Sequence, residues 1–225
     1  NALEKLQHST IDKVVLKKVR NGVFGGRLRL CVSGGGALPR HVDETMLGMG
    51  MPMRNGYGLT ETSPVASIRL PHQLESGHIG PPLPQTRIEA RREDGTAVPR
   101  GETGILWIHG PQIMRGYYEN PTRTKEVLTD DGWFNSGDLG HCDANGNFWI
   151  TGRAKDTIVL AGGENVEPEP IETLIKTAPL IEQAVVVGQD QKALGVLIVP
   201  NKDALEHEAP AEQWGVAGDT MQSDL

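Results

Sequence analysis

A short polar segment between two apolar runs limits what this chain can fold into, because it predicts a joint between two folded units. The first apolar run ends at Thr151, and Gly152 gives the backbone freedom. Arg153 and Lys155 follow, before a second run over residues 157–160. The next loop holds Gly162, Gly163 and Glu164. A fixed cation on one side and a glycine pair on the other indicate that something anionic is handled and that one unit moves over it.

The composition is typical of a globular protein and excludes several functional classes. The chain has 225 residues, enough for one or two domains, and a net charge of −7 from 22 Lys and Arg against 29 Asp and Glu. No global positive field favours nucleic acid as a partner. Cys31 and Cys142 show neither metal-ligand spacing nor a disulfide framework, as in a reducing compartment. No apolar run approaches the ~20 residues of a membrane span, so we expect a cytoplasmic protein without a transmembrane segment and leave peripheral membrane contact open.

The first third of the chain predicts the end of an α/β sheet. Apolar residues near a 3.6-residue period predict an amphipathic helix over residues 3–20, and residues 27–32 have the pattern of a strand. A glycine-rich loop follows the strand, and Pro39 opens a helix. The loop glycines are Gly34, Gly35 and Gly36. Nucleotides lie in such crevices because glycine lets the backbone approach the ligand and a helix start favours anions; a plain tight turn is the alternative.

A second glycine-rich segment offers more specific chemistry. Gly56 and Gly58 bracket Tyr57, whose ring can lie flat beside a planar ligand while the main chain stays close. Thr60 and Glu61 then offer a hydroxyl suited to a phosphate oxygen and a carboxylate suited to a hard divalent cation. The alternative is a glycine-rich turn in which Thr60 caps a helix.

Beyond residue 84 the pattern changes to short strands separated by turns, which predicts a small β-barrel-like subdomain. The predicted elements are strands at residues 87–91, 104–109 and 113–118 and a brief helix over residues 121–128. An Asn145–Gly146 turn predicts a hairpin that returns over residues 148–151. Trp107, Trp133, Trp149 and the pair Tyr117 and Tyr118 fall within strand patterns, and we interpret them as packing residues.

Asp138 is the acidic residue of this region with a candidate function. It follows Ser136 and Gly137 at a predicted turn. A carboxylate held there can accept two hydrogen bonds from a vicinal diol such as that of ribose. An isolated Ser-Gly-Asp sequence is also typical of a simple turn, and this alternative stays open.

The last part of the chain predicts a compact α+β unit. A helix that follows Pro170 carries Ile171 and Leu174 on one side, and apolar runs at residues 184–187 and 194–199 predict two strands. We therefore expect an α/β protein in three parts. These are the end of a large α/β subdomain over residues 1–84, a small β-barrel-like subdomain over residues 85–152 and an incomplete, mobile α+β C-terminal domain over residues 153–225.

Five segments in this order resemble the motifs of the adenylate-forming (AMP-binding) superfamily of acyl-CoA synthetases, peptide-synthetase adenylation domains and luciferases. The matching segments are residues 33–39, 56–61, 101–122, 134–138 and 152–172. In the last segment, residues 163–168 before Ile171 and Glu172 look most like the branch that activates long-chain fatty acids.

The resemblance implies two half-reactions in one site. A carboxylate attacks the α-phosphate of ATP to give acyl-AMP and pyrophosphate, and a thiol, commonly that of coenzyme A, then takes the acyl group. By resemblance Thr60 contacts phosphate, Glu61 binds Mg²⁺, and Lys155 is the hinge of the small domain. The residues that the resemblance assigns to ATP or AMP are Gly34, Gly35, Gly36, Gly56, Tyr57, Gly58, Asp138 and Arg153. Those that it assigns to the thiol channel are Gly162, Gly163 and Glu164.

Two motifs of the superfamily are missing from the sequence. The phosphate loop that ends in Pro-Lys does not occur, and Lys202 lacks the Gly-Lys context of the lysine that completes adenylation. Ser136 stands where Thr is usual and keeps the hydroxyl. We therefore expect a fragment of a fatty acid ligase that lacks the N-terminal part and the C-terminal end, and that is inactive by itself.

Three other interpretations stay open. Acyl carrier protein rather than coenzyme A is an alternative acceptor for the parent enzyme. The fragment is alternatively a nucleotide-binding or interaction module without turnover. In the third interpretation the glycine-rich loops are only turns of a stable α/β domain.

Overall fold

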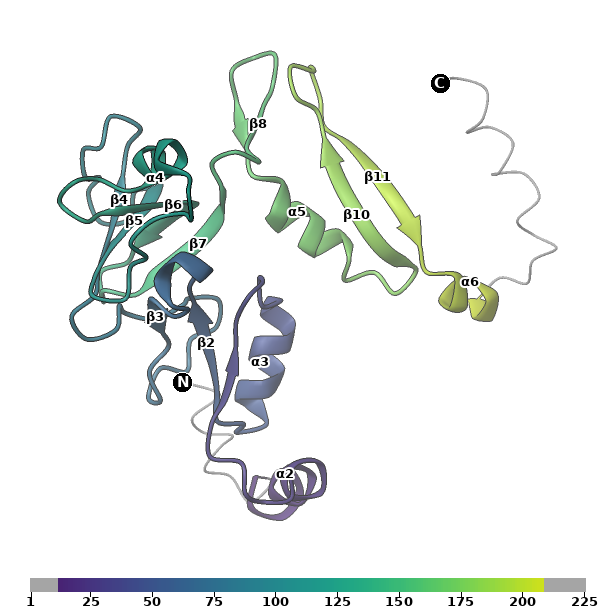
Figure 1. The fold of residues 1–225 in the computed structure, drawn as a ribbon. Helices are drawn as coiled ribbons and strands as arrows, with labels where there is room; N and C mark the ends of the chain where they lie inside the picture. Colours follow the sequence, from purple (N-terminus) through teal and green to yellow (C-terminus); the bar gives the residue numbers. More distant parts are fainter. Residues whose placement is uncertain (1–11, 209–225) are drawn as a thin grey trace. The chain divides into compact units, whose positions relative to one another are not determined.

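The computed structural model describes residues 12–208 of the chain. The chain divides into two compact units, Asn1–Ala154 and Lys155–Leu225, and this boundary lies within the polar segment described above. The three-part division at residues 84 and 152 stays a prediction. The first unit contains η1 (Asp12–Leu16), α2 (Lys17–Phe24), β1 (Cys31–Ser33), α3 (Arg40–Gly48), β2 (Met53–Tyr57), η2 (Thr60–Thr62), β3 (Ser67–Ile68), β4 (Arg87–Arg91), β5 (Gly104–His109), α4 (Pro121–Val127), β6 (Phe134–Cys142) and β7 (Phe148–Arg153) (Figure 1). The second contains β8 (Ile158–Val159), β9 (Asn165–Val166), α5 (Pro168–Ile175), β10 (Ile181–Val187), β11 (Gly195–Pro200) and α6 (Lys202–Glu208).

The first described element is a helix that begins with one π-helical turn, η1, and continues as α2. It ends at Gly25, whose φ of 66° is the left-handed conformation that commonly terminates helices. The helix predicted over residues 3–20 is confirmed in its described part and extends to Phe24. Residues 3–11 of that prediction lie outside the described residues.

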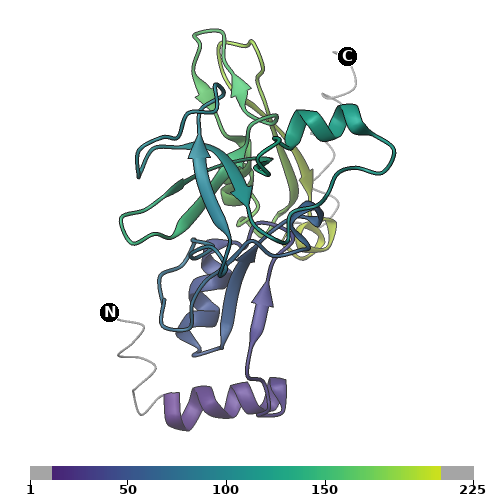
Figure 2. The same cartoon turned by 60° about the vertical axis from the view of Figure 1, so that its left-hand side comes forward.

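A strand–helix–strand unit follows and confirms the predicted α/β character. β1 and β2 pair in parallel with α3 between them in sequence, and β3 joins the other edge of β2 in the antiparallel sense (Figure 2). β1 starts at Cys31 rather than at residue 27 because its partner strand starts only at Met53. The chain just before Met53 turns at Gly50, which has a φ of 67°, so residues 27–30 have no strand beside them there.

A buried ion pair ties α3 to the segment after β3. Nη1 and Nη2 of Arg69 lie 2.5 and 2.6 Å from Oδ2 and Oδ1 of Asp43, and both side chains are almost fully buried. Asp43 also accepts a hydrogen bond from the backbone N–H of Gly77, and Arg69 donates to the carbonyl of Glu75. The bidentate geometry pairs the two charges where water cannot solvate them.

The β-rich part of the first unit is an antiparallel sheet in the order β4-β5-β6-β7. The strands predicted at residues 87–91 and 104–109 are confirmed as β4 and β5, and the predicted Asn145–Gly146 turn joins β6 to β7. The sheet has two edges among the described residues, so it does not close into a barrel. Its buried face forms the core with Ala66, Ile79, Ile88, Ala90, Leu106, Ile108, Phe134 and Phe148.

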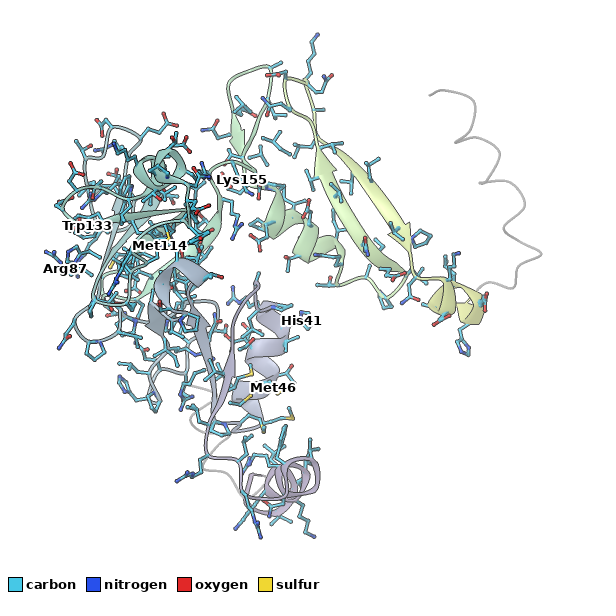
Figure 3. All side chains as sticks on the ribbon, viewed as in Figure 1. His41, Met46, Arg87, Met114, Trp133 and Lys155 are labelled. Carbon is cyan, nitrogen blue, oxygen red and sulfur yellow. The ribbon has the colours of Figure 1, made fainter. Side chains whose placement is uncertain are left out.

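The opposite face of the same sheet carries stacked cations and aromatic rings. The guanidinium carbon of Arg91 lies 4.0 Å from the ring centroid of Trp133 and 5.3 Å from that of Trp107. Arg87 lies 5.1 Å from the Trp133 ring, and Figure 3 shows these two side chains together. The interpretation of Trp107 and Trp133 as packing residues is therefore confirmed.

The strand predicted at residues 113–118 is wrong, because the backbone there bonds to groups outside any ladder. The N–H of Met114 donates to the carbonyl of Glu61, and the N–H of Tyr117 donates to the hydroxyl of Thr124. Tyr118 is 90% exposed, so the packing interpretation was also wrong for this residue. The predicted brief helix is confirmed as α4.

The second unit is built on the β10–β11 hairpin. α5 packs against β10, and the Glu172 carboxylate on α5 accepts a hydrogen bond from the N–H of Val186. Ala184 and Val186 are the buried residues of β10, whereas β11 is exposed throughout. The two predicted strands are confirmed, with β10 starting three residues earlier, at Ile181.

Each described helix is too short or too polar to cross a lipid bilayer.

The buried ion pair predicts a large difference between two arginine substitutions. Arg69→Met leaves the Asp43 carboxylate buried without its partner, and we expect a loss of about 3–5 kcal/mol in the free energy of unfolding. Arg92→Met removes an exposed ion pair between Arg92 and Glu102, whose side chains are 53% and 57% accessible, respectively. We expect this change to lower the free energy of unfolding by at most about 1 kcal/mol. Urea unfolding of both variants measures the difference, and equal stabilities would contradict the structural importance of the buried pair.

Candidate nucleotide-binding site

Three residues that the sequence predicted to share a site lie together in the first unit. The Tyr57 hydroxyl donates a hydrogen bond of 2.6 Å to Oδ2 of Asp138, and Nε of Arg153 lies 2.9 Å from Oδ1. Tyr57 ends β2, Asp138 lies in β6, and Arg153 ends β7. The β6–β7 register places Asp138 directly opposite Arg153. The sheet pairing therefore brings together residues that are far apart in the sequence.

Asp138 is held by an irregularity in β6 and not by the simple turn that was the alternative. Three residues of β6 lie opposite the single residue Leu106 of β5, and Gly137 has a φ of 73°. The Ser136 hydroxyl donates to the Leu106 carbonyl at 2.7 Å and accepts from the N–H of Asp138 at 3.1 Å. These two bonds replace ladder bonds that the bulge removes, and they fix the backbone that carries the acid.

The cluster pairs a buried carboxylate, that of Asp138, with the partly exposed guanidinium of Arg153. Asp138 is 4% exposed, whereas the Arg153 side chain is 48% exposed. Burial raises the pKa of Tyr57 well above its ordinary value, and the Asp138 charge and hydrogen bond raise it further. Tyr57 therefore stays a neutral donor, and the carboxylate keeps one phenol and one guanidinium partner.

The glycines of the two predicted loops have different structural requirements. A Cβ on Gly34 would lie 3.0 Å from the carbonyl oxygen of Gly56, so these two predicted segments meet at the ends of β1 and β2. A Cβ on Gly58 would collide with the carbonyl oxygen of Pro64. Gly35 has a φ of 86°, a conformation that side-chain-bearing residues rarely adopt. Gly36 shows neither requirement.

Glu61 lies in the short η2 helix and has a partner that sequence reasoning missed. The Tyr117 hydroxyl donates a 2.8 Å hydrogen bond to Oε1 of Glu61, and desolvation together with this bond raises the pKa of Tyr117. Thr60 is exposed and does not cap η2; the Thr62 hydroxyl accepts from the N–H of Leu59 instead. The Gly-Tyr-Tyr motif was part of the resemblance, but its strand-like pattern favoured packing for Tyr117.

The other predicted residues belong to the second unit. Lys155 is its first residue and is exposed. The predicted thiol-channel residues lie in the exposed loop that joins β8 to β9: Gly162, Gly163 and Glu164. The N–H of Gly163 donates to the Leu160 carbonyl, and Gly163 has a φ of 84°, so glycine suits this tight loop.

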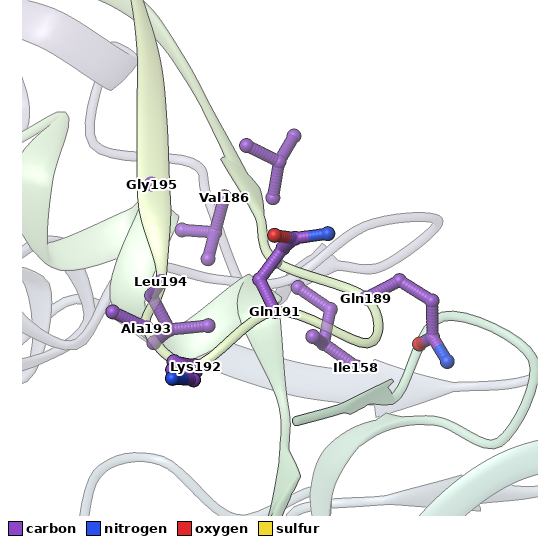
Figure 4. Close-up of a pocket in the computed structure, with 10 residues that line it drawn as sticks. Ile158, Val186, Gln189, Gln191, Lys192, Ala193, Leu194 and Gly195 are labelled. Carbon is purple, nitrogen blue, oxygen red and sulfur yellow. The ribbon is translucent and has the colours of Figure 1, made fainter. Parts of the chain in front are cut away.

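A separate hollow of about 830 Å³ lies within the second unit, at the turn of the β10–β11 hairpin (Figure 4). None of the predicted site residues in the described part of the chain lines it. Its lining residues are Ile158, Val186, Val187, Gly188, Gln189, Gln191, Lys192, Ala193, Leu194 and Gly195.

The raised pKa of Tyr57 predicts an alkaline dependence of stability. Tyr57 ionises at higher pH in the folded than in the unfolded chain, so its contribution is complete below about pH 10 and is lost as the pH rises above that value. We expect the free energy of unfolding of the unmodified chain to fall more steeply above about pH 10 than that of Tyr57→Phe. Urea unfolding as a function of pH tests this, with Tyr118→Phe as the matched control; parallel curves for Tyr57→Phe and the unmodified chain would contradict it.

Comparison with protein families gives two matches, separated by residues 119–154. Residues 3–118 match the family described as AMP-binding enzyme, and residues 155–215 match the family described as AMP-binding enzyme C-terminal domain. The second match begins at the boundary of the second unit.

Curated relatives include ligases that act on fatty acids. The chain is 45% identical over 213 residues to the probable acyl-activating enzyme 16, chloroplastic, of Arabidopsis thaliana, covering 90% of this chain and 29% of that protein. It is 42% identical over 216 residues to the long-chain-fatty-acid–[acyl-carrier-protein] ligase AEE15, chloroplastic, of the same plant, with the same coverages of 90% and 29%. It is 38% identical over 204 residues to the long-chain-fatty-acid–CoA ligase FadD15 of Mycobacterium bovis, covering 91% and 32%. The chain thus spans about 30% of the length of these relatives.

Solved structures agree with the family matches. The O-succinylbenzoate coenzyme A synthetase MenE of Bacillus subtilis, in complex with ATP and a magnesium ion, aligns with a TM-score of 0.70 at 28% identity, covering 77% of this chain and 37% of that one. ATP-bound MatB of Rhodopseudomonas palustris aligns with a TM-score of 0.70 at 29% identity, covering 89% and 42%. The sequence, the fold and both family matches lead to one conclusion: this chain belongs to the AMP-binding enzyme family, as its resemblance to the adenylate-forming superfamily predicted.

Proposed function

We propose that the protein to which this chain belongs activates fatty acids with ATP. It forms acyl-AMP and pyrophosphate from a carboxylic acid and ATP and then transfers the acyl group to a thiol. The observation that carries this proposal is the cluster of Tyr57, Asp138 and Arg153 beside the glycines at the ends of β1 and β2. The fatty acid as substrate is supported by relatives that are named as long-chain-fatty-acid ligases.

The cluster suits an adenosine monophosphate ester. Each oxygen of the Asp138 carboxylate already accepts one hydrogen bond and retains capacity for a second, so a ribose diol can donate to both oxygens. The Arg153 side chain is 48% exposed beside this carboxylate, and its positive charge suits an anionic ligand. The Tyr57 hydroxyl is fixed by its bond to Asp138, and its ring, which packs against the core but is only partly buried, is proposed to lie beside the adenine plane.

Mg²⁺ is the metal ion that the proposal requires, and Glu61 is the residue that suits it. Among residues 12–208 no group of three or more His, Cys, Asp or Glu side chains is arranged to hold a metal ion. Mg²⁺ does not need such a cage, because it is usually held by one or two carboxylates together with substrate phosphates and water. Bound there, the ion would neutralise negative charge that builds up on the phosphates. Thr60, exposed next to Glu61, offers its hydroxyl to a phosphate oxygen.

The second unit supplies the residues proposed for the thiol half-reaction. Lys155 is the proposed hinge, and Gly162, Gly163 and Glu164 are proposed to line the path of the thiol. A Cβ on either glycine would meet no atom within 4 Å, because both lie in an exposed loop. Coenzyme A is the proposed acceptor; acyl carrier protein is the second candidate, because a relative 42% identical is named as a ligase for it. Product analysis of the whole protein with each thiol separates the two.

For residues 1–225 alone we propose nucleotide binding without turnover. These residues span about 30% of the length of the curated relatives, so most of an enzyme of that size lies outside them. Calorimetry with AMP tests binding, and acyl-CoA formation by residues 1–225 alone would contradict the proposal.

The proposed role of Asp138 predicts a selective loss of ATP affinity. In the whole protein, Asp138→Asn removes the charge that orients Arg153, and hydrogen bonds to a charged group contribute about 1.5–3 kcal/mol each. We expect the KM for ATP to rise about 10–100-fold, with a smaller change in the KM for the fatty acid. Steady-state kinetics measure both constants.

Asp131→Asn is the matched control, because Asp131 is exposed and its carboxylate accepts a hydrogen bond from the nearby Thr129 hydroxyl. We expect its KM for ATP to equal that of the unmodified protein. An unchanged KM for ATP in Asp138→Asn would overturn the assignment of Asp138 to the nucleotide.

A further inference from the structure

Glu61 is held by a segment that lies outside its own short helix, η2. The N–H of Met114 donates to the Glu61 carbonyl at 2.9 Å, and the Tyr117 hydroxyl donates to Oε1 at 2.8 Å. Glu61 and Tyr117 are 56 positions apart in the sequence. The loop between β5 and α4 therefore holds both the backbone and the side chain of this residue.

Tyr117 is itself held in a defined position. Its N–H donates to the Thr124 hydroxyl at 2.9 Å, and the same hydroxyl donates to the Asn120 carbonyl at 2.9 Å at the start of α4. Gly116 has a φ of 147°, and a Cβ there would lie 2.9 Å from a side-chain carbon of Thr124. α4 thus anchors the backbone of Tyr117, and the tyrosine side chain extends from this anchor to Glu61.

The chemistry of the contact is directional. A neutral phenol donates one hydrogen bond, so it engages one oxygen of the carboxylate and selects one orientation of the Glu61 side chain. Tyr117 uses Oε1 and leaves Oε2 available as a donor atom for a cation. Hydrogen bonds to ligating carboxylates fix ligand orientation at metal sites, and their removal typically weakens metal binding 10–100-fold.

We propose that Tyr117 is a positioning residue that orients the Glu61 carboxylate so that Oε2 ligates the divalent cation accompanying ATP. This inference rests on the proposed function, in which Glu61 holds that cation. Tyr117 does not touch the reacting atoms; it acts through Glu61.

The test is direct measurement of cation affinity in the whole protein. Mn²⁺ is the probe, with a non-hydrolysable α,β-methylene analogue of ATP present, and free Mn²⁺ is measured by electron paramagnetic resonance. We expect Tyr117→Phe to weaken Mn²⁺ binding about 10–100-fold and to raise the Mg²⁺ concentration needed for half-maximal kcat. The KM for the fatty acid should not change.

Three further variants make the result decisive. Tyr118→Phe is the matched control, since Tyr118 is the neighbouring tyrosine and is 90% exposed; we expect wild-type affinity for Mn²⁺. Thr124→Ala removes the acceptor of the Tyr117 N–H without altering the tyrosine, and we expect a smaller loss in the same direction. Thr124→Ala also provides a test of the inference if the Tyr117→Phe variant folds poorly. Glu61→Gln removes the carboxylate that is proposed to ligate the cation, so its loss of Mn²⁺ affinity is the largest that we expect.

Two results would contradict the proposals at different levels. If Glu61→Gln weakens Mn²⁺ binding but Tyr117→Phe and Thr124→Ala do not, the positioning role is wrong and the proposed function stands. If Glu61→Gln itself leaves Mn²⁺ affinity unchanged, the assignment of the cation to Glu61 is wrong, and the role of Tyr117 fails with it.

Discussion

The first unit depends on accommodating a buried carboxylate. Asp138 is 4% exposed, and a carboxylate in the interior is strongly destabilising unless it is paired. Its partners, Tyr57 and Arg153, come from the ends of β2 and β7, so the acid is stabilised only when the mixed β1-β2-β3 sheet and the antiparallel β4-β5-β6-β7 sheet are both in place. The bulge in β6 lies directly before this acid, and there the Ser136 hydroxyl bonds to the Leu106 carbonyl and to the Asp138 N–H.

Local patterns in the sequence were sufficient for most elements of the fold. Residues 87–91 alternate with a period of two, residues 105–108 form a short apolar run, and the structure has strands at residues 87–91 and 104–109 as predicted. Pro121 at the start of α4 and the Asn145–Gly146 turn are signals that need only neighbouring residues. The grouping of Tyr57 with Asp138 and Arg153 came from the resemblance, since no local rule relates residues so far apart.

The features that could not be predicted are contacts between distant polar residues. Asp43 looks like one acidic residue on an amphipathic helix, and only the fold places Arg69 beside it, 26 positions away. Tyr117 lies in a segment whose pattern is strand-like, but its N–H donates to the Thr124 hydroxyl and its carbonyl accepts from the N–H of Asn120, outside any ladder. The partner of Asp43 and the partner of Tyr117 are both set by the tertiary structure. The local sequence around each residue does not indicate which distant side chain will pack against it.

The last hydrogen bond of the first unit links the joint to the bulge in β6. The N–H of Ala154 donates to the carbonyl of Gly137 at 2.9 Å, and Gly137 immediately precedes Asp138. The Gly137 carbonyl and the Asp138 N–H belong to one peptide group, so the backbone that ends the first unit and the backbone that carries the acid are held at the same peptide.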